Sequence, residues 1–164
     1  MLIAVCSDIH DNIWALEKAL EPMRQADVAV FCGDFCAPFT LVQLAEGFAG
    51  DIHVVWGNND GDRWLLTRNA AAFGHVHLHG EMAQVELGGM RVGVNHYPDI
   101  AGPLAASGHF DLVCYGHDHK ANDTQVGGCR LLNPGELMGR FGRSSFVLLN
   151  TATGQAESVE VQAR

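Results

Sequence analysis

The sequence indicates an α/β domain in which two β-sheets pack together and helices cover the outside. In the first half, short apolar runs alternate with stretches whose apolar residues recur at helical spacing. In the second half, segments of alternating polarity are separated by glycine turns, as in hairpins. The chain has 164 residues, of which 48% are hydrophobic and 18% charged, which allows a sizeable core and excludes disorder. We therefore expect residues 1–164 to form a single domain.

The first half contains three strands that we expect to be buried on both faces, each followed by a helix. The continuous apolar runs that predict these strands are Leu2 to Cys6, Val28 to Cys32 and Ile52 to Trp56. Capping residues and a proline mark where the helices begin. The expected helices start at Ile13 after Asp11 or Asn12, at Pro38, and after Asp62 in the direction of Phe73.

The second half is expected to be mainly antiparallel β-structure, with one short helix around Ala101 to Ser107. The predicted strands and hairpins are His75 to His79, Met82 to Leu87 with Met90 to Asn95, Asp111 to Tyr115, Gln125 to Leu132, and Ser144 to Gln162. Turns near Gly88-Gly89, Gly127-Gly128 and Thr153-Gly154 separate the hairpin strands.

Charge and hydropathy exclude several classes of protein. Ten Lys and Arg residues against 19 Asp and Glu give a net charge of -9, which disfavours stable nucleic-acid binding. No uncharged apolar stretch approaches the ~18 residues that a membrane-spanning helix needs, and we expect no membrane association. The five cysteines are odd in number and form no C-x-x-C pair, so we expect free thiols and a cytoplasmic location.

Polar residues that can bind metal ions follow the expected strands. They are Asp8 and His10, then Asp34, then Asn58, Asn59 and Asp60, then His96, and finally His117 and His119. Ligands usually bind in the crevice beyond the carboxyl ends of strands. A single Asp, Asn or His at such a place is more often a cap or a turn residue, but five strand ends in succession favour a metal site.

Carboxylate, imidazole and amide ligands together suit manganese, iron, zinc, nickel or cobalt. These residues are too many for one ion, so we expect two divalent ions about 3.5 Å apart, bridged by a carboxylate and a water. Such a pair lowers the pKa of the bridging water and stabilises charge on a phosphoryl group. The predicted reaction is therefore hydrolysis of a phosphate ester.

The same residues resemble the signature of the calcineurin-like metallophosphoesterases. The matching motifs, in order, are D-x-H (Asp8, His10), G-D (Gly33-Asp34), G-N-x-D (Gly57 to Asp60), the isolated His96, and G-H-x-H (Gly116 to His119). The resemblance covers about residues 2–135, and the short chain is similar to the small bacterial and archaeal phosphodiesterase branch. It implies a four-layer α/β/β/α sandwich of two mixed sheets flanked by helices.

The resemblance also implies a role for each residue. Asp8, His10 and His119 would hold the first ion, Asp34 would bridge both ions, and Asn58, His96 and His117 would hold the second. Asn59 and Asp60 would occupy the catalytic positions of the family motif, and the bridging water would attack phosphorus. Manganese is the expected metal, with nickel, iron, zinc or cobalt as alternatives.

Four positions depart from the family pattern, among them Asp118, which replaces a threonine and is either an acceptor for a ligand imidazole or solvated. Asn59 stands where many larger members have a histidine; its amide can donate a hydrogen bond to phosphate but cannot supply a proton. We therefore expect activated aryl esters to be cleaved better than alkyl esters. Tyr97 replaces a glycine and could partly close the site or stack on a substrate base. Glu136 replaces the serine of an N-P-G-S segment, which we interpret as structural.

We expect a small phosphate-ester substrate, with diesters preferred over monoesters. The alternatives are a phosphomonoesterase, a nucleotide-polyphosphate hydrolase, or a non-catalytic scaffold on the same fold. Exposed strands in the second half make a homodimer or homotetramer reasonable.

Trp14 either packs in the core or forms a platform for a base. The imidazoles of His75, His77 and His79 either form an adventitious metal site or line a solvated or subunit-facing surface.

Overall fold

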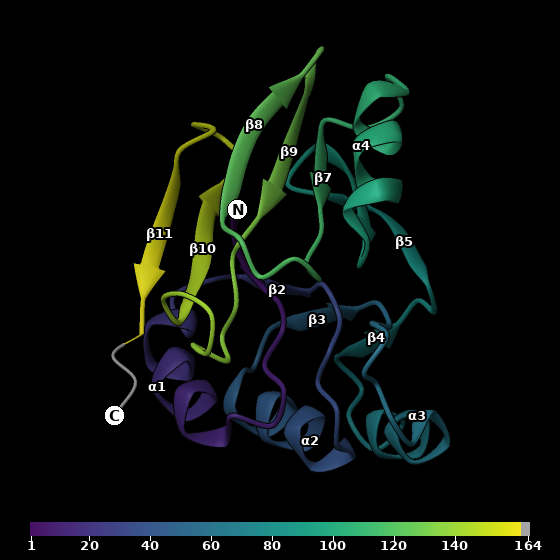
Figure 1. The fold of residues 1–164 in the computed structure, drawn as a ribbon, viewed down its shortest axis with the longest axis vertical. Helices are drawn as coiled ribbons and strands as arrows, with labels where there is room; N and C mark the ends of the chain where they lie inside the picture. Colours follow the sequence, from purple (N-terminus) through teal and green to yellow (C-terminus); the bar gives the residue numbers. More distant parts are fainter. Residues whose placement is uncertain (162–164) are drawn as a thin grey trace.

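The structure is a computed structural model that describes residues 1–161, so Gln162, the end of the last expected hairpin, lies outside the described residues. The chain forms two mixed sheets that pack face to face, with helices on both outer faces (Figure 1). This arrangement confirms the four-layer α/β/β/α sandwich. Within residues 1–161, no helix has the length and apolar character needed to cross a membrane.

The first sheet has six strands in the order β11-β10-β1-β2-β3-β4. Strands β1 (Leu2–Cys6), β2 (Val28–Phe31), β3 (Asp51–Val54) and β4 (Val76–Leu78) pair with one another in parallel. Strand β10 (Ser145–Asn150) pairs antiparallel with β1, and β11 (Ala156–Glu160) pairs antiparallel with β10. Helices α1 (Ile13–Met23), α2 (Pro38–Gly47) and α3 (Arg63–Ala70) lie along its outer face (Figure 1). Asn12 caps α1, because its side-chain oxygen accepts a hydrogen bond from the Ala15 amide at 3.1 Å.

The second sheet has five strands in the order β5-β6-β7-β9-β8. They are β5 (Met82–Leu87), β6 (Met90–Asn95), β7 (Leu112–Cys114), β8 (Asn122–Val126) and β9 (Cys129–Asn133). Helix α4 (Pro98–Ala106) packs on the outer face of this sheet.

The expected antiparallel character of the second half is wrong for the centre of this sheet. Strands β6, β7 and β9 pair in parallel, and β4 pairs in parallel with β3 in the first sheet. Alternating polarity shows which faces of a strand are buried, but it carries no information on the direction of the neighbouring strand. Helix α4 forms the crossover that a parallel β6–β7 pair requires.

Alternation along the central strands places each residue in one of two cores. Ala4 and Cys6 of β1 face helices α1–α3, whereas Ile3 and Val5 of the same strand face the second sheet. The continuous apolar run that predicted β1 thus reflects burial on both faces. The resulting rigid sandwich fixes where the carboxyl ends of the strands lie, and therefore where the site is.

Candidate metal centre

The carboxyl ends of strands from both sheets meet at one edge of the sandwich. Asp8 and His10 follow β1, Asp34 follows β2, Asn58 follows β3, His96 follows β6, and His117 and His119 follow β7. The structure brings all seven expected ligands together through a continuous chain of side-chain contacts between 2.8 and 3.6 Å. Residues separated by more than 100 positions therefore share one site.

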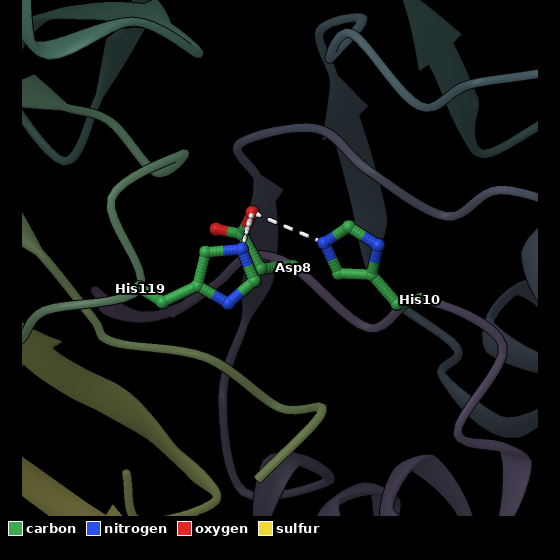
Figure 2. Close-up of side chains that lie close together, drawn as sticks. All are labelled: Asp8, His10 and His119. Carbon is green, nitrogen blue, oxygen red and sulfur yellow. Dashed lines mark ion pairs between the residues drawn. The ribbon is translucent and has the colours of Figure 1, made fainter. Parts of the chain in front are cut away.

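The first group centres on Asp8. Its Oδ1 atom lies 3.6 Å from His10 Nε2 and 3.5 Å from His119 Nε2, and both imidazoles point toward this oxygen (Figure 2). Asp8 Oδ1 and His10 Nε2 are buried and have no hydrogen-bond partner. A buried carboxylate oxygen and imidazole nitrogen without partners are costly unless something binds both. A divalent cation fits this donor set, because it accepts lone pairs from all three residues.

The second group centres on Asp34, which is also buried. Its Oδ2 atom lies 3.4 Å from His10 Nε2 and 3.5 Å from His96 Nε2. Donor atoms of Asp8, Asp34 and His96 all lie within 4.8 Å of one another. Asp34 thus connects the Asp8 group to the side of the site where His96 lies.

Asn58 and His117 complete the side of the site next to His96. The side-chain oxygen of Asn58 lies 3.1 Å from His96 Nε2 and 2.8 Å from His117 Nδ1. The backbone amide of His117 donates to Asp8 Oδ2 at 3.1 Å. An amide oxygen and two imidazole nitrogens therefore converge at a place distinct from the Asp8 Oδ1 group.

The buried carboxylates make the site attractive to cations. Burial opposes ionisation of Asp34, but hydrogen bonds with His96 and Asn59 outweigh it and lower the pKa of Asp34 to about 2. Burial also opposes protonation of His10 and His96, but the Asp8 and Asp34 carboxylates outweigh it and raise both pKa values. The same negative field that favours a proton on these rings favours a divalent ion in its place.

The backbone at the site is strained. Seven non-glycine residues within positions 1–161 have a left-handed φ, and five of them are expected metal ligands. Those five, with φ between 44° and 73°, are Asp8, His10, Asp34, His117 and His119. Each such conformation costs about 1–3 kcal/mol and persists where the surroundings over-determine it, which is common at functional sites.

Glycines allow the ligand-bearing turns to pack closely. A Cβ atom on Gly57 would lie 2.6 Å from the Asp34 amide nitrogen and would overlap Asp34 Oδ1. A Cβ on Gly116 would lie 2.6 Å from Asp8 Oδ2 and would overlap the Ser7 hydroxyl. These glycines let the backbone approach the carboxylates closely.

The two expected catalytic residues, Asn59 and Asp60, both contact Asp34. Asp60 is buried; its oxygens accept backbone amide hydrogens from Gly57, Asp34 and Phe35 at 2.7–3.1 Å, and burial raises its pKa. These contacts hold the β2 and β3 turns together and so help to position Asp34, and a catalytic role for Asp60 stays a prediction. Asn59 donates its side-chain amide to Asp34 Oδ2 at 2.8 Å, and thereby orients that carboxylate.

Tyr97 lies beside the ligand rings. Its ring centre is 5.1 Å from those of His96 and His117, in an edge-to-face arrangement with both. The half-buried ring therefore forms part of the wall of the site, and stacking on a substrate base stays a prediction.

In three of the expected ligand histidines, the second ring nitrogen is held by a neighbour, as is usual for metal-binding imidazoles. His96 Nδ1 lies 2.7 Å from the Cys32 carbonyl oxygen, His10 Nδ1 lies 3.3 Å from Cys36 Sγ, and His119 Nδ1 lies 2.6 Å from Glu136 Oε2. The sequence interpretation missed the contact of Glu136. The only signal was the acid in place of a serine in the Asn133-Pro134-Gly135 segment.

Two hollows flank the Asp8 group. One of about 670 Å³ is lined by His10, Trp14 and the start of α1. The other, of about 530 Å³, is lined by His119, Lys120, Phe141 and Arg143. The indole of Trp14 and the ring of Phe141 are each 69% exposed. Each hollow thus begins at one of the two imidazoles on Asp8 Oδ1 and offers an exposed aromatic ring.

Two buried carboxylates, one amide and four imidazoles at the meeting edges of two sheets define a hydrolytic metal site of the metallophosphoesterase class. Known proteins agree. A family model described as "Calcineurin-like phosphoesterase superfamily domain" matches residues 1–154. The chain therefore belongs to the calcineurin-like phosphoesterase superfamily and is a metal-dependent hydrolase of phosphate esters, which confirms the resemblance seen in the motifs.

Individual relatives place the chain in the small archaeal and bacterial branch. It is 29% identical over 143 residues to Phosphodiesterase MJ0936 of Methanocaldococcus jannaschii, covering 85% of this chain and 86% of that protein. A solved structure described as a novel archaeal phosphodiesterase superposes with a TM-score of 0.90 at 25% identity, covering 98% of this chain and 99% of that one. Vps29 of Entamoeba histolytica, solved with Zn²⁺, has the same fold, with a TM-score of 0.66, 20% identity, and coverage of 99% and 100%.

Proposed function

We propose that this chain is a phosphodiesterase that uses two divalent ions, with manganese preferred over nickel, iron, zinc and cobalt. Asp8, His10 and His119 would hold one ion, Asn58, His96 and His117 would hold the other, and Asp34 would be shared by both. When bound, the ions supply the positive charge that activates a bridging water and stabilises the phosphoryl group. Support comes from the partnerless atoms Asp8 Oδ1 and His10 Nε2, and from the position of Asp34 between His10 and His96.

The observation that carries the preference for diesters is the pair of hollows on either side of Asp8. A phosphodiester has two organic substituents on phosphorus, whereas a monoester has one. With phosphorus at the metal centre, one substituent extends past His10 toward Trp14, and the other extends past His119 toward Phe141. An exposed aromatic ring in each hollow favours substituents with flat, apolar surfaces.

Asn59 orients the bridging carboxylate and supplies no proton to the leaving oxygen. Its backbone and side-chain amides both donate to Asp34, at 2.7 and 2.8 Å. A leaving group with a low pKa departs without protonation, so aryl esters are cleaved faster than alkyl esters.

The diester proposal is tested by Trp14→Ala, assayed on bis-p-nitrophenyl phosphate and on p-nitrophenyl phosphate with Mn²⁺. Loss of an aromatic contact worth about 1 kcal/mol raises the KM for the diester about fivefold. Trp64 on α3 is also 69% exposed but lines neither hollow, so Trp64→Ala is the matched control. A wild-type enzyme that prefers the monoester, or equal effects of the two tryptophan variants, would contradict the proposal.

A non-catalytic scaffold on the same fold is the second candidate. Elemental analysis and a turnover assay separate the two functions. A phosphodiesterase contains two ions per chain and hydrolyses the aryl diester, whereas a scaffold shows no turnover in the presence of excess metal. Rates on a dinucleoside polyphosphate, compared with those on the two aryl esters, test the nucleotide-polyphosphate alternative.

We further propose that residues 1–164 act as a single cytoplasmic domain that assembles as a dimer or tetramer. The core shared by the two sheets supports a single domain, and the five free cysteines are suited to a reducing compartment. Strands β4 and β11 lie at the edges of the first sheet, where unpaired backbone groups can join another subunit. Light scattering on the purified protein distinguishes the oligomeric states.

A further inference from the structure

We propose that Glu136 is a positioning residue that fixes the metal ligand His119 and ties the loop Gly139–Gly142 to it. The inference rests on the proposed function only in taking His119 as a ligand. Glu136 follows β9 in the Asn-Pro-Gly segment and is fully buried. Its carboxylate oxygens accept three hydrogen bonds: Oε2 at 2.6 Å from His119 Nδ1, and Oε1 from the amides of Phe141 and Gly142 at 2.6 and 2.7 Å.

The contact with His119 sets which ring nitrogen carries the proton. A carboxylate only accepts hydrogen bonds, so Nδ1 of His119 donates and Nε2 presents its lone pair. That nitrogen is the one that lies 3.5 Å from Asp8 Oδ1. Glu136 therefore holds the imidazole in the tautomer and direction that a metal ion on the Asp8 group requires.

The other oxygen of the same carboxylate holds a loop. Phe141 and Gly142 both donate their amides to Oε1. The Phe141 ring meets the His119 ring edge-on with 5.2 Å between ring centres, and the Arg140 guanidinium lies 5.1 Å from the centre of the Phe141 ring. Phe141 and Gly142 also line the hollow on the His119 side. Glu136 therefore couples the position of Phe141 and Gly142, which form this wall of the hollow, to the position of His119.

The charges around Glu136 favour a metal ion bound to His119. Among residues 1–161, His119 is the one ion-pair partner of Glu136, and no lysine or arginine pairs with it. A buried carboxylate with so little compensating charge is costly. With an ion on Nε2, the His119 ring would be a stronger Nδ1–H donor to Glu136, and the stronger hydrogen bond would offset that cost.

The test is a titration of metal-free protein with Mn²⁺. Calorimetry measures the affinity for each ion, and thermal unfolding measures the rise in Tm on metal addition. Glu136→Gln cannot accept all three hydrogen bonds, and Glu136→Ser installs the residue of the family pattern and removes them all. We expect each variant to bind one of two ions about 10–100-fold more weakly, with a smaller metal-induced rise in Tm. Glu157→Gln, which removes an exposed acid on β11, is the charge-matched control and retains wild-type binding.

Two further measurements keep the proposal testable if a variant folds poorly. In wild-type protein, the Phe141 and Gly142 amide resonances shift on Zn²⁺ addition, because their acceptor is bonded to a ligand. In Glu136→Ser, trypsin cleaves after Arg140 faster than in Glu157→Gln, because the loop has lost both amide contacts. Unchanged affinity for both ions in the variants, a metal-independent loss of Tm, or amide resonances that do not respond to Zn²⁺ would overturn the role of Glu136. A wild-type chain that binds no ion would instead overturn the proposed function.

Discussion

Asp34 is the single side chain on which most of the site depends. It is buried, contacts His10 and His96, and is held in its ionised form by hydrogen bonds that lower its pKa to about 2. Asp34→Asn keeps the shape but removes the negative charge that would lie between the two proposed ions. We expect kcat/KM on bis-p-nitrophenyl phosphate to fall by at least about tenfold, with an unchanged circular dichroism spectrum. Retention of more than about a tenth of the rate would count against a bridging Asp34.

Individual site residues differ in how far the sequence can reveal them. Asp8, Asp34 and His117 could be proposed because each follows an apolar run and a short polar or glycine turn, a pattern that is visible locally. The role of Glu136 could not be predicted, because it depends on a loop and a histidine that only the folded chain brings to its carboxylate. The anchoring contacts of Asp60 likewise come from turns of two different strands.

The turn after β3 is where backbone geometry controls the site. A methyl group at Gly57 would displace the Asp34 carboxylate, since its Cβ would overlap Oδ1. We expect Gly57→Ala to lower kcat/KM and weaken Mn²⁺ binding, each by about tenfold or more, as misplaced ligands do. Gly74→Ala is the matched control, because a Cβ there meets no atom within 4 Å. Activity of Gly57→Ala equal to that of Gly74→Ala would show that this turn tolerates displacement.

His53 on β3 and His77 and His79, in and just after β4, form a group of imidazoles that is separate from the expected ligands. His53 Nδ1 lies 2.9 Å from His79 Nε2, and the His53 ring stacks on that of His77. His75 lies apart from these rings and contacts the Ala45 carbonyl oxygen at 3.1 Å. The alternating imidazoles of the sequence therefore do not form one set of three. Two of them pair instead with His53 on the neighbouring strand.

This pairing predicts a loss of stability in mild acid. Burial, with the nearby charges of His79 and His77, lowers the pKa of His53 to about 4, below the ~6.5 of the unfolded chain. The unfolded state then binds the proton more readily, so stability is full above about pH 6.5 and falls as the pH decreases toward 4. The urea midpoint of Mn²⁺-loaded protein should decrease between pH 7.5 and 5, and decrease less in His53→Gln. An identical pH slope for the variant would exclude His53 as the cause.

The direction in which neighbouring strands pair could not be predicted from the sequence alone. The hairpins around Gly88-Gly89 and Gly127-Gly128 were predictable, because a tight turn forces antiparallel pairing. The parallel pairing of β6, β7 and β9 depends on where the chain returns after α4, which local polarity does not encode.

In the whole molecule, the carboxyl ends of strands from the two sheets meet at one edge of the sandwich. The first sheet brings Asp8 and Asp34 to this edge, the second brings His96 and His117, and the shared apolar core holds the edges in register. The layered fold could be expected from the order of the motifs, since the resemblance to the family spans most of the chain. The two hollows could not, because they depend on how α1 and the Gly139–Gly142 loop lie beside the site.

Anomalous diffraction from crystals grown with Mn²⁺ tests whether these residues hold a pair of ions. Two peaks about 3.5–4 Å apart are expected, one beside Asp8, His10 and His119 and the other beside Asn58, His96 and His117, with Asp34 between them. No peak at this edge, or a single ion with Asp34 outside its ligand set, would contradict the two-metal mechanism.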